Sequence, residues 1–244
     1  MSAFVPAVRP LSARSIVLSL LLGAHPAQLP VAALVELAGT VGVAEPTLRV
    51  ALTRMVTAGD LERTDGAYRL SDRLLARQRR QDAAVDVVTR AWRGGWEMVV
   101  VTASGRDAAD RARLRTTLAD LRLAELREGV WLRPDNLRRP LPAELADVGE
   151  RFALRPVPDA AAIAARLWPL TAWAAEGRSL LARLGRARRP ADRLALAAAV
   201  VRHLVADPVL PPALLPDRWP AAQLRESYAT YRGELSALVR GRAG

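Results

Sequence analysis

The sequence predicts an α+β fold in three parts: an N-terminal winged helix-turn-helix over residues 1–90, a central ferredoxin-like βαββαβ domain over residues 91–157 and a C-terminal α-helical domain over residues 158–244. Three observations predict it. Helical spacing of apolar residues marks the first part, short β-branched segments replace it in the second, and helical spacing returns in the third. A tight-turn dipeptide also follows the third predicted helix directly, as expected of a wing.

Composition limits the class of protein. The 244 residues are 51% apolar and 25% charged, which is typical of globular chains, and the lack of cysteine excludes a disulfide scaffold, a thiolate metal site and a cysteine nucleophile. All 36 basic residues are arginine and leave a net charge of +11, which favours a polyanionic partner, although an arginine-only chain can also reflect genomic base composition. The apolar run Ile16–Leu22 is too short to span a bilayer, so we expect a cytoplasmic chain without a membrane partner.

Three helices are predicted near the N-terminus, over residues 12–23, 31–39 and 46–58. A glycine at or just after the end of each is typical of a helix C-terminus, and Ser12 can cap the first. Pro46 suits the first turn of the third helix. Four residues at helical spacing form the apolar face of this helix: Leu48, Ala51, Leu52 and Met55.

A hairpin is predicted directly after the third helix. Leu61–Arg63 and Tyr68–Leu70 have strand character and flank Asp65-Gly66, a dipeptide that accepts the backbone angles of a tight turn. A further helix is expected from Ser71. It carries four arginines that either contact phosphates or form a solvated face: Arg73, Arg77, Arg79 and Arg80. Three helices followed by a hairpin form the winged helix-turn-helix pattern.

The third helix and the hairpin carry the residues expected to bind DNA. Five residues lie opposite the apolar face of the helix, with Thr47 at the edge of this face: Pro46, Arg49, Val50, Thr53 and Arg54. Arginine can bond guanine through two hydrogen bonds, threonine can bond bases or phosphates, and an aliphatic methyl can contact the methyl of thymine. Three hairpin residues would flank the same DNA: Arg63, Thr64 and Arg69. The alternative is an ordinary solvated face, but the position of this helix before a hairpin favours DNA binding.

The central part changes to shorter segments. The expected elements are a strand over 96–101, a helix over 107–121, strands over 124–127 and 130–133, a short helix over 143–148 and a strand over 151–154. The order βαββαβ is that of a ferredoxin-like domain.

Three helices are expected in the C-terminal part, over Ala160–Leu184, Ala191–Val205 and Ala221–Val239. Between the last two, residues 207–220 contain five prolines, which exclude a regular helix. Leucine and valine residues interleaved with these prolines favour a packed loop over a linker.

No catalytic or metal-binding motif is recognisable. His25 and His203 lie far apart in the sequence, and neither has a carboxylate at metal-ligand spacing. The chain has no glycine-rich phosphate-binding loop and no G-x-S-x-G nucleophile motif. We therefore expect a protein that is not an enzyme and that uses no metal or cofactor.

One segment near the C-terminus resembles a family signature. Residues 207–220 read DPVLPPALLPDRWP, which resembles the DPxLPxxLLPxxWP signature of the PaaX family of bacterial transcriptional regulators, named for the repressor of phenylacetate catabolism. Three weaker matches support the resemblance, over residues 48–55, 68–71 and 128–137. It covers nearly the whole chain.

The resemblance implies a winged helix, a Cas2-like middle domain and a C-terminal helical domain. It also implies a homodimer that binds double-stranded DNA, typically as a repressor, and is released by an acyl-CoA effector such as phenylacetyl-CoA. A CoA thioester requires arginines beside an apolar pocket. Four residues are candidates for this effector site, with core packing as the alternative for each tryptophan: Trp131, Arg133, Trp168 and Trp173.

Two features depart from the family pattern. Trp168-Pro169-Leu170 stands where the family usually has Trp-Asp-Leu, a difference that concerns the effector. The hairpin turn Thr64–Ala67 is short beside many family wings, which concerns the share of DNA affinity that the wing supplies.

Two other functions compete with DNA binding. Cas2 proteins of the same middle fold are metal-dependent nucleases with a carboxylate at the end of the first strand. Here that strand ends Val101-Thr102-Ala103-Ser104, without an acid to hold a hard cation. The other alternative is a regulator-like chain that only scaffolds other proteins.

Overall fold

The computed structural model describes residues 11–103, 105–139, 142–155 and 159–240, which form two compact units. The first unit contains the described residues up to Asp86, Ala175–Ala206 and those from Pro220 onwards. The second contains the described residues of Val87–Ala174 and Asp207–Trp219. The segment predicted as a C-terminal domain contributes to both units, and the division into three domains stays a prediction.

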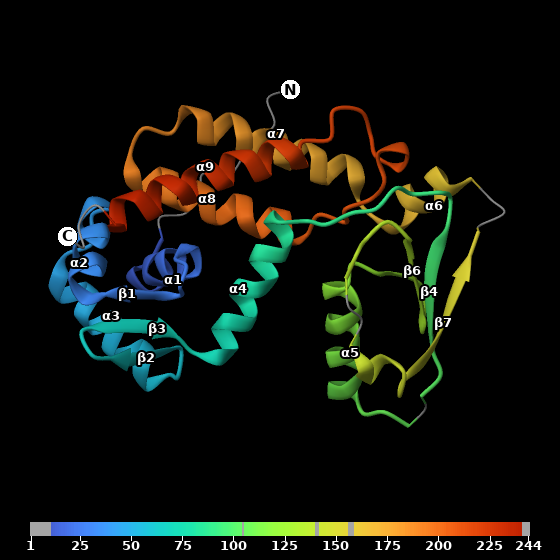
Figure 1. Ribbon diagram of the computed structural model, residues 1–244, viewed down its shortest axis with the longest axis horizontal. Helices are drawn as coiled ribbons and strands as arrows, with labels where there is room; N and C mark the ends of the chain where they lie inside the picture. Colours follow the sequence, from blue (N-terminus) through green and yellow to red (C-terminus); the bar gives the residue numbers. More distant parts are fainter. Residues whose placement is uncertain (1–10, 104, 140–141, 156–158, 241–244) are drawn as a thin grey trace. The chain divides into compact units, whose positions relative to one another are not determined.

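The N-terminal part of the first unit is a winged helix-turn-helix (Figure 1). Its elements are α1 (Ala13–Gly23), β1 (Gln28–Pro30), α2 (Val31–Thr40), α3 (Glu45–Thr57), β2 (Leu61–Thr64), β3 (Ala67–Leu70) and α4 (Asp72–Val85). The strands form an antiparallel sheet in the order β1-β3-β2. The predicted helices and both hairpin strands are confirmed, whereas β1 is an addition to the predicted pattern.

Local signals explain most of these elements. Ser12 caps α1, because its hydroxyl accepts a hydrogen bond from the backbone N–H of Ser15 at 3.2 Å. In the two-residue turn between β2 and β3, Gly66 has φ +68°, a conformation that glycine adopts without strain. Apolar faces of α1, α2 and α3 then build one core, in which Val17, Leu34 and Leu48 are fully buried.

The C-terminal helices complete the first unit. They are α8 (Pro190–Val205) and α9 (Ala221–Arg240), and they pack beside α4 in agreement with Figure 1. Leu194 of α8 and Leu235 of α9 join the core of the winged helix. Both helices are confirmed as predicted, within one residue at each end.

The predicted continuous helix over Ala160–Leu184 is wrong. The structure has two helices there, α6 (Ala160–Leu167) and α7 (Leu170–Arg186), separated by Trp168 and Pro169. Trp168 is extended, with φ −128° and ψ 139°, because the proline ring disfavours helical geometry in the residue before it. The helical spacing of apolar residues on both sides of Pro169 concealed this break.

The second unit contains a four-stranded antiparallel sheet. Its elements are β4 (Trp96–Val101), α5 (Ala108–Asp120), β5 (Ala124–Arg127), β6 (Val130–Pro134), the 3-10 turn η1 (Ala143–Leu145) and β7 (Gly149–Leu154). The strand order β5-β6-β4-β7 is that of a ferredoxin-like domain, which confirms the predicted fold. Only the second helix differs, since the predicted helix over residues 143–148 is a three-residue 3-10 turn.

Both faces of this sheet are covered. On one face, Val99 of β4 and Trp131 of β6 pack with Leu118 of α5. On the other face, Trp96 packs with residues of α6 and with the proline-rich segment. That segment contains the 3-10 turn η2 (Pro212–Leu214), with Leu210 and Leu214 buried, so the predicted packed loop is confirmed. No helix in the described part of the chain is both long and apolar enough to cross a membrane.

Candidate nucleic-acid interface

The exposed face of α3 carries the six helix residues expected to bind DNA. Leu48, Leu52 and Met55 are buried and fix α3 against α1. The opposite face is solvent-exposed at all six predicted positions: Pro46, Thr47, Arg49, Val50, Thr53 and Arg54. Val50 is 50% exposed and thus open to contact. The structure therefore brings these residues together on one open surface.

A groove of about 680 Å³ runs along this surface, between α3 and the start of α1. Thr47, Val50 and Arg54 line it from α3, and Ser12 and Arg14 line it from the α1 side. The surface is therefore a recessed apolar strip bordered by arginines. A strip of this kind can accept the edge of a nucleic-acid base or its methyl group.

The arginines of the predicted interface differ in their partners. Arg49 is paired with Glu45 one turn earlier, through hydrogen bonds of 2.8 and 2.5 Å to Oε1. Arg69 is paired with Glu62 across the hairpin. Arg54 and Arg63, by contrast, have no ion-pair partner in the described part of the chain. These two guanidinium groups are available to phosphates without first leaving a carboxylate.

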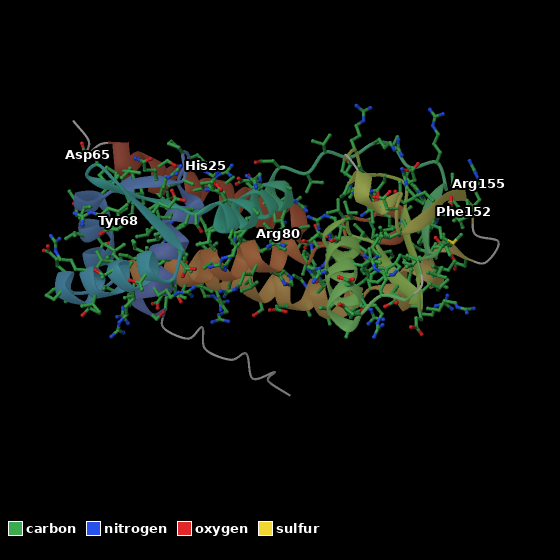
Figure 2. The ribbon with its side chains drawn as sticks, turned by 90° about the horizontal axis from the view of Figure 1, so that it is seen from below. His25, Asp65, Tyr68, Arg80, Phe152 and Arg155 are labelled. Atoms are coloured by element: carbon green, nitrogen blue, oxygen red, sulfur yellow. The ribbon has the colours of Figure 1, made fainter. Side chains whose placement is uncertain are left out.

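The wing divides its three predicted contacts between two faces. Arg63 lies opposite Tyr68, on the face that carries the buried Leu61 and Leu70. Thr64 and Arg69 lie on the other face, because successive residues of a strand alternate. The turn itself is exposed, with Asp65 at its tip (Figure 2). DNA that lies against one face of the wing can contact either Arg63 or the pair Thr64 and Arg69. It can contact all three residues only if it surrounds the wing.

A buried carboxylate holds the junction between α3 and the wing, and sequence reasoning missed it. Asp60 is 2% exposed, and its Oδ2 accepts a hydrogen bond of 2.7 Å from Nη2 of Arg14. Its Oδ1 accepts a further bond from Arg73 of α4. The backbone N–H of Asp60 also donates to the carbonyl oxygen of Met55 at 2.9 Å. Asp60 thereby connects α1, α3, α4 and β2, so it orients the recognition surface without belonging to it.

The four effector candidates lie on different sides of the second unit's sheet. Trp131 packs in the core against α5, whereas Trp168 lies beside Trp96 on the other face, with ring centroids 6.4 Å apart. Trp173 stacks on Trp219 at 4.3 Å. Trp131 lines a cavity with a volume of about 380 Å³. The sheet therefore separates Trp131 from Trp168.

Arg133 is an anchor for the proline-rich segment. It is fully buried, and its guanidinium donates to Asn136 Oδ1 at 2.9 Å and to the carbonyl oxygen of Val209 at 3.3 Å. Asn136 donates to the same carbonyl at 3.0 Å. Burial and the nearby positive charge of Arg139 lower the pKa of Arg133 to about 9, against the opposing effect of Glu97. With these internal partners, the guanidinium of Arg133 stabilises the fold.

The described residues contain no group of three or more histidine, aspartate or glutamate side chains that could hold a metal ion. At the end of β4, Val101 is followed by Thr102 and Ala103, which have no carboxylate. Ser104 lies outside the described residues.

Comparisons with known proteins agree with this architecture. The family model described as PaaX-like protein matches residues 12–74, and the model described as PaaX protein central Cas2-like domain matches residues 89–153. The solved structure of the uncharacterized protein Rv0674 from Mycobacterium tuberculosis is similar, with 49% sequence identity and a TM-score of 0.79. The similarity covers 94% of this chain and 98% of that chain.

A comparison with curated proteins found no match. The two matched regions contain the winged helix and the four-stranded sheet, and together they span more than half of the chain. The resemblance of residues 207–220 to the family signature extends the agreement towards the C-terminus. The protein therefore belongs to the PaaX family, whose members are transcriptional regulators.

Proposed function

We propose that the protein is a transcriptional repressor that binds duplex DNA as a homodimer and is released by an acyl-CoA effector, with phenylacetyl-CoA as the first candidate. The observation that carries the DNA-binding part is the exposed face of α3. Six residues suited to base and phosphate contact share it, and Arg54 has no ion-pair partner in the described structure. Family membership supports the same function.

To read the DNA sequence, Arg49 must break its ion pair with Glu45 and form hydrogen bonds with a base instead. The ion pair is exposed, with 61% of the arginine side chain and 48% of the glutamate side chain accessible. Pairs of this kind contribute only about 0.2 to 1 kcal/mol. A bidentate contact with guanine is worth about 1 to 3 kcal/mol of discrimination, so the exchange is favourable.

The homodimer part of the proposal is supported by the small footprint of one winged helix on DNA. One recognition helix contacts few base pairs, and two copies related by a twofold axis double the number that is read. The expected operator is therefore an inverted repeat whose half-sites are separated by about one helical turn or a multiple of it.

The acyl-CoA part of the proposal is supported by the cavity beside Trp131. Arg106, Arg111 and Arg115 line this cavity together with Trp131 and Leu114. The Nη1 atom of Arg106 is buried without a hydrogen-bond partner among the described residues. Phosphate groups prefer arginine forks, and an acyl group prefers apolar walls, so the lining has both components that a CoA thioester requires.

Fluorescence anisotropy with the DNA upstream of the protein's own gene tests the function. We expect the full-length protein to bind this DNA much more tightly than a scrambled duplex at the same salt concentration. Phenylacetyl-CoA should then release the specific complex. Equal affinity for both duplexes would contradict a sequence-specific regulator, and no release by a panel of acyl-CoA thioesters would contradict the effector class.

A further inference from the structure

A second pocket, apart from the proposed effector cavity, lies inside the first unit. It has a volume of about 150 Å³ and is formed by α1, α4, α8 and α9. None of the four effector candidates lines it. Four arginines do: Arg14, Arg77, Arg202 and Arg232.

Two of these arginines are neutralised within the protein. Nη2 of Arg14 lies 2.7 Å from Oδ2 of the buried Asp60. Nη1 of Arg232 lies 3.5 Å from Oδ1 of Asp82 on α4. These two side chains therefore border the pocket with their charge already compensated.

The other two arginines are uncompensated. Arg77 of α4 and Arg202 of α8 make no hydrogen bond or ion pair with any described residue. Arg77 is partly buried, and this burial lowers its pKa; the positive charges of Arg202, Arg14 and Arg80 lower it further. Positive charges gathered in this way repel one another, and a bound anion would relieve the repulsion.

A buried polar side chain faces the same space. Gln81 of α4 is only 6% exposed and lines the pocket. Its side-chain amide has no hydrogen-bond partner among the described residues and is accessible from the pocket. The amide is therefore free to donate a hydrogen bond to a ligand and to accept one from it.

Part of the remaining wall is apolar, beside the polar side chains of Ser15, Ser19, Tyr228 and Tyr231, and the volume of the pocket limits the size of the ligand. Leu18 and Leu22 of α1 and Val201 of α8 are buried and line the pocket. An apolar cavity of about 150 Å³ holds a benzene molecule, whereas pockets for drug-sized ligands measure about 300 to 1,000 Å³. The pocket therefore suits a small ligand with one ring.

We propose that this pocket binds a small organic acid with a ring-sized apolar body, whose carboxylate is held by Arg77 and Arg202 and whose ring lies between α1 and α8. Guanidinium forks match the two oxygens of a carboxylate. The amide of Gln81 supplies a further hydrogen bond. Arg14 borders the pocket and also binds Asp60, so an incoming carboxylate competes with Asp60 for this arginine. Ligand binding would then loosen the junction that orients α3, an effect that rests on the proposed function.

Isothermal titration calorimetry on the full-length protein without DNA tests the site. The probes are benzoate, phenylacetate and 3-phenylpropionate, with phenylacetamide as the uncharged control and inorganic phosphate as the anion without a ring. We expect one bound carboxylate per chain for at least one acid. Phenylacetamide should bind about tenfold more weakly or worse, as expected on losing charge-assisted hydrogen bonds, and phosphate should give no saturable binding.

Three variants locate the binding. Arg77→Ala and Gln81→Leu should each lower the affinity for the best acid, by about tenfold or more for the arginine. Arg79→Ala removes the same charge from an exposed position on α4 outside the pocket, and should leave the affinity unchanged. We expect Arg77→Ala to remain folded, because it removes a repelled charge. If it unfolds, Gln81→Leu decides the matter.

The proposal is overturned if no acid binds, if phenylacetamide binds as tightly as phenylacetate, or if Arg79→Ala weakens binding as much as Arg77→Ala. Anisotropy with upstream DNA separates this result from the proposed function. Acid binding to the free protein without any specific DNA binding would overturn the regulator and retain the site. Specific DNA binding without acid binding would overturn the acid-binding site and retain the regulator.

Discussion

The exposed face of α3 and the four effector candidates differ in how the fold brings their residues together. On α3, six residues share a surface because one helix repeats every 3.6 residues and its other side is buried. The effector candidates come from β6, from the break between α6 and α7, and from α7. The sheet separates Trp131 from Trp168, and Arg133 is enclosed by hydrogen bonds.

This difference shows which sites residue type and spacing can predict. A site within one helix follows from periodicity alone. A site assembled from several segments depends on strand register and packing, which residue type does not reveal. Tryptophans and arginines therefore mark a core as readily as a pocket, and the variants that follow separate the two roles.

The largest effect is expected from Arg133→Ala. This variant leaves the carbonyl oxygen of Val209 and the carboxylate of Glu97 with fewer partners in a buried setting. We expect a loss of about 3 to 5 kcal/mol in the free energy of unfolding, measured by urea denaturation. Arg138→Ala, at an exposed position nearby, is the control and should change little. An unchanged stability together with lost acyl-CoA binding would instead make Arg133 a ligand-binding residue.

A smaller loss is expected from Asp60→Ala. The substitution removes hydrogen bonds from two charged groups, Arg14 and Arg73, to a buried carboxylate. Since both arginines are mostly exposed, we expect about 1.5 to 3 kcal/mol of destabilisation by urea denaturation, towards the lower end. DNA affinity should fall as well, because Asp60 positions the wing. Asp65→Ala at the exposed turn is the control. An equal loss of stability and DNA affinity in this variant would contradict the special role of Asp60.

Arg63→Ala tests the wing. Arg63 has no partner among the described residues, so we expect it to contact a phosphate. Removal of one phosphate contact lowers the steepness of the log–log dependence of affinity on salt concentration by about 0.9. Anisotropy titrations at several salt concentrations measure this slope. Arg178→Ala, with the same charge change at an exposed position of α7, should retain the slope of the wild type. An equal change in both variants would indicate only a diffuse charge effect.

The smallest effect is expected from Glu45→Ala. Without Glu45, Arg49 no longer leaves an exposed ion pair when it meets DNA. A pair worth about 0.2 to 1 kcal/mol corresponds to a gain in DNA affinity of up to about fivefold. Glu62→Ala, which frees Arg69 in the wing, provides the matched comparison. A larger gain in DNA affinity from Glu62→Ala than from Glu45→Ala would indicate that the wing, and not α3, makes the principal contact with DNA.

Much of the fold could be predicted because its signals are local. Ser12 and the spacing of Leu48, Leu52 and Met55 define α1 and α3 without distant contacts. The three residues of β1 are too few for a pattern and are ordered by pairing with β3. The bond between Arg133 and Val209 joins residues 76 positions apart, which spacing cannot reveal.

The residues of the candidate site also differ in whether the sequence could predict them. The exposed residues of α3 could be predicted from one helix, although their contacts with DNA stay predictions. Asp60 could not, because an acid after a helix-ending glycine looks like an ordinary surface residue until Arg14 and Arg73 are placed around it.

The most direct test of the account measures base preference in α3. Anisotropy would give the affinities of the wild type, Arg49→Ala and Arg178→Ala for the upstream site and for a panel of its single-base variants. The account predicts that Arg49→Ala loses about 1 to 3 kcal/mol of affinity and no longer discriminates at one position in each half-site, while Arg178→Ala keeps the wild-type preference. Unchanged affinity and base preference in Arg49→Ala would contradict the assignment of α3 as the helix that reads DNA.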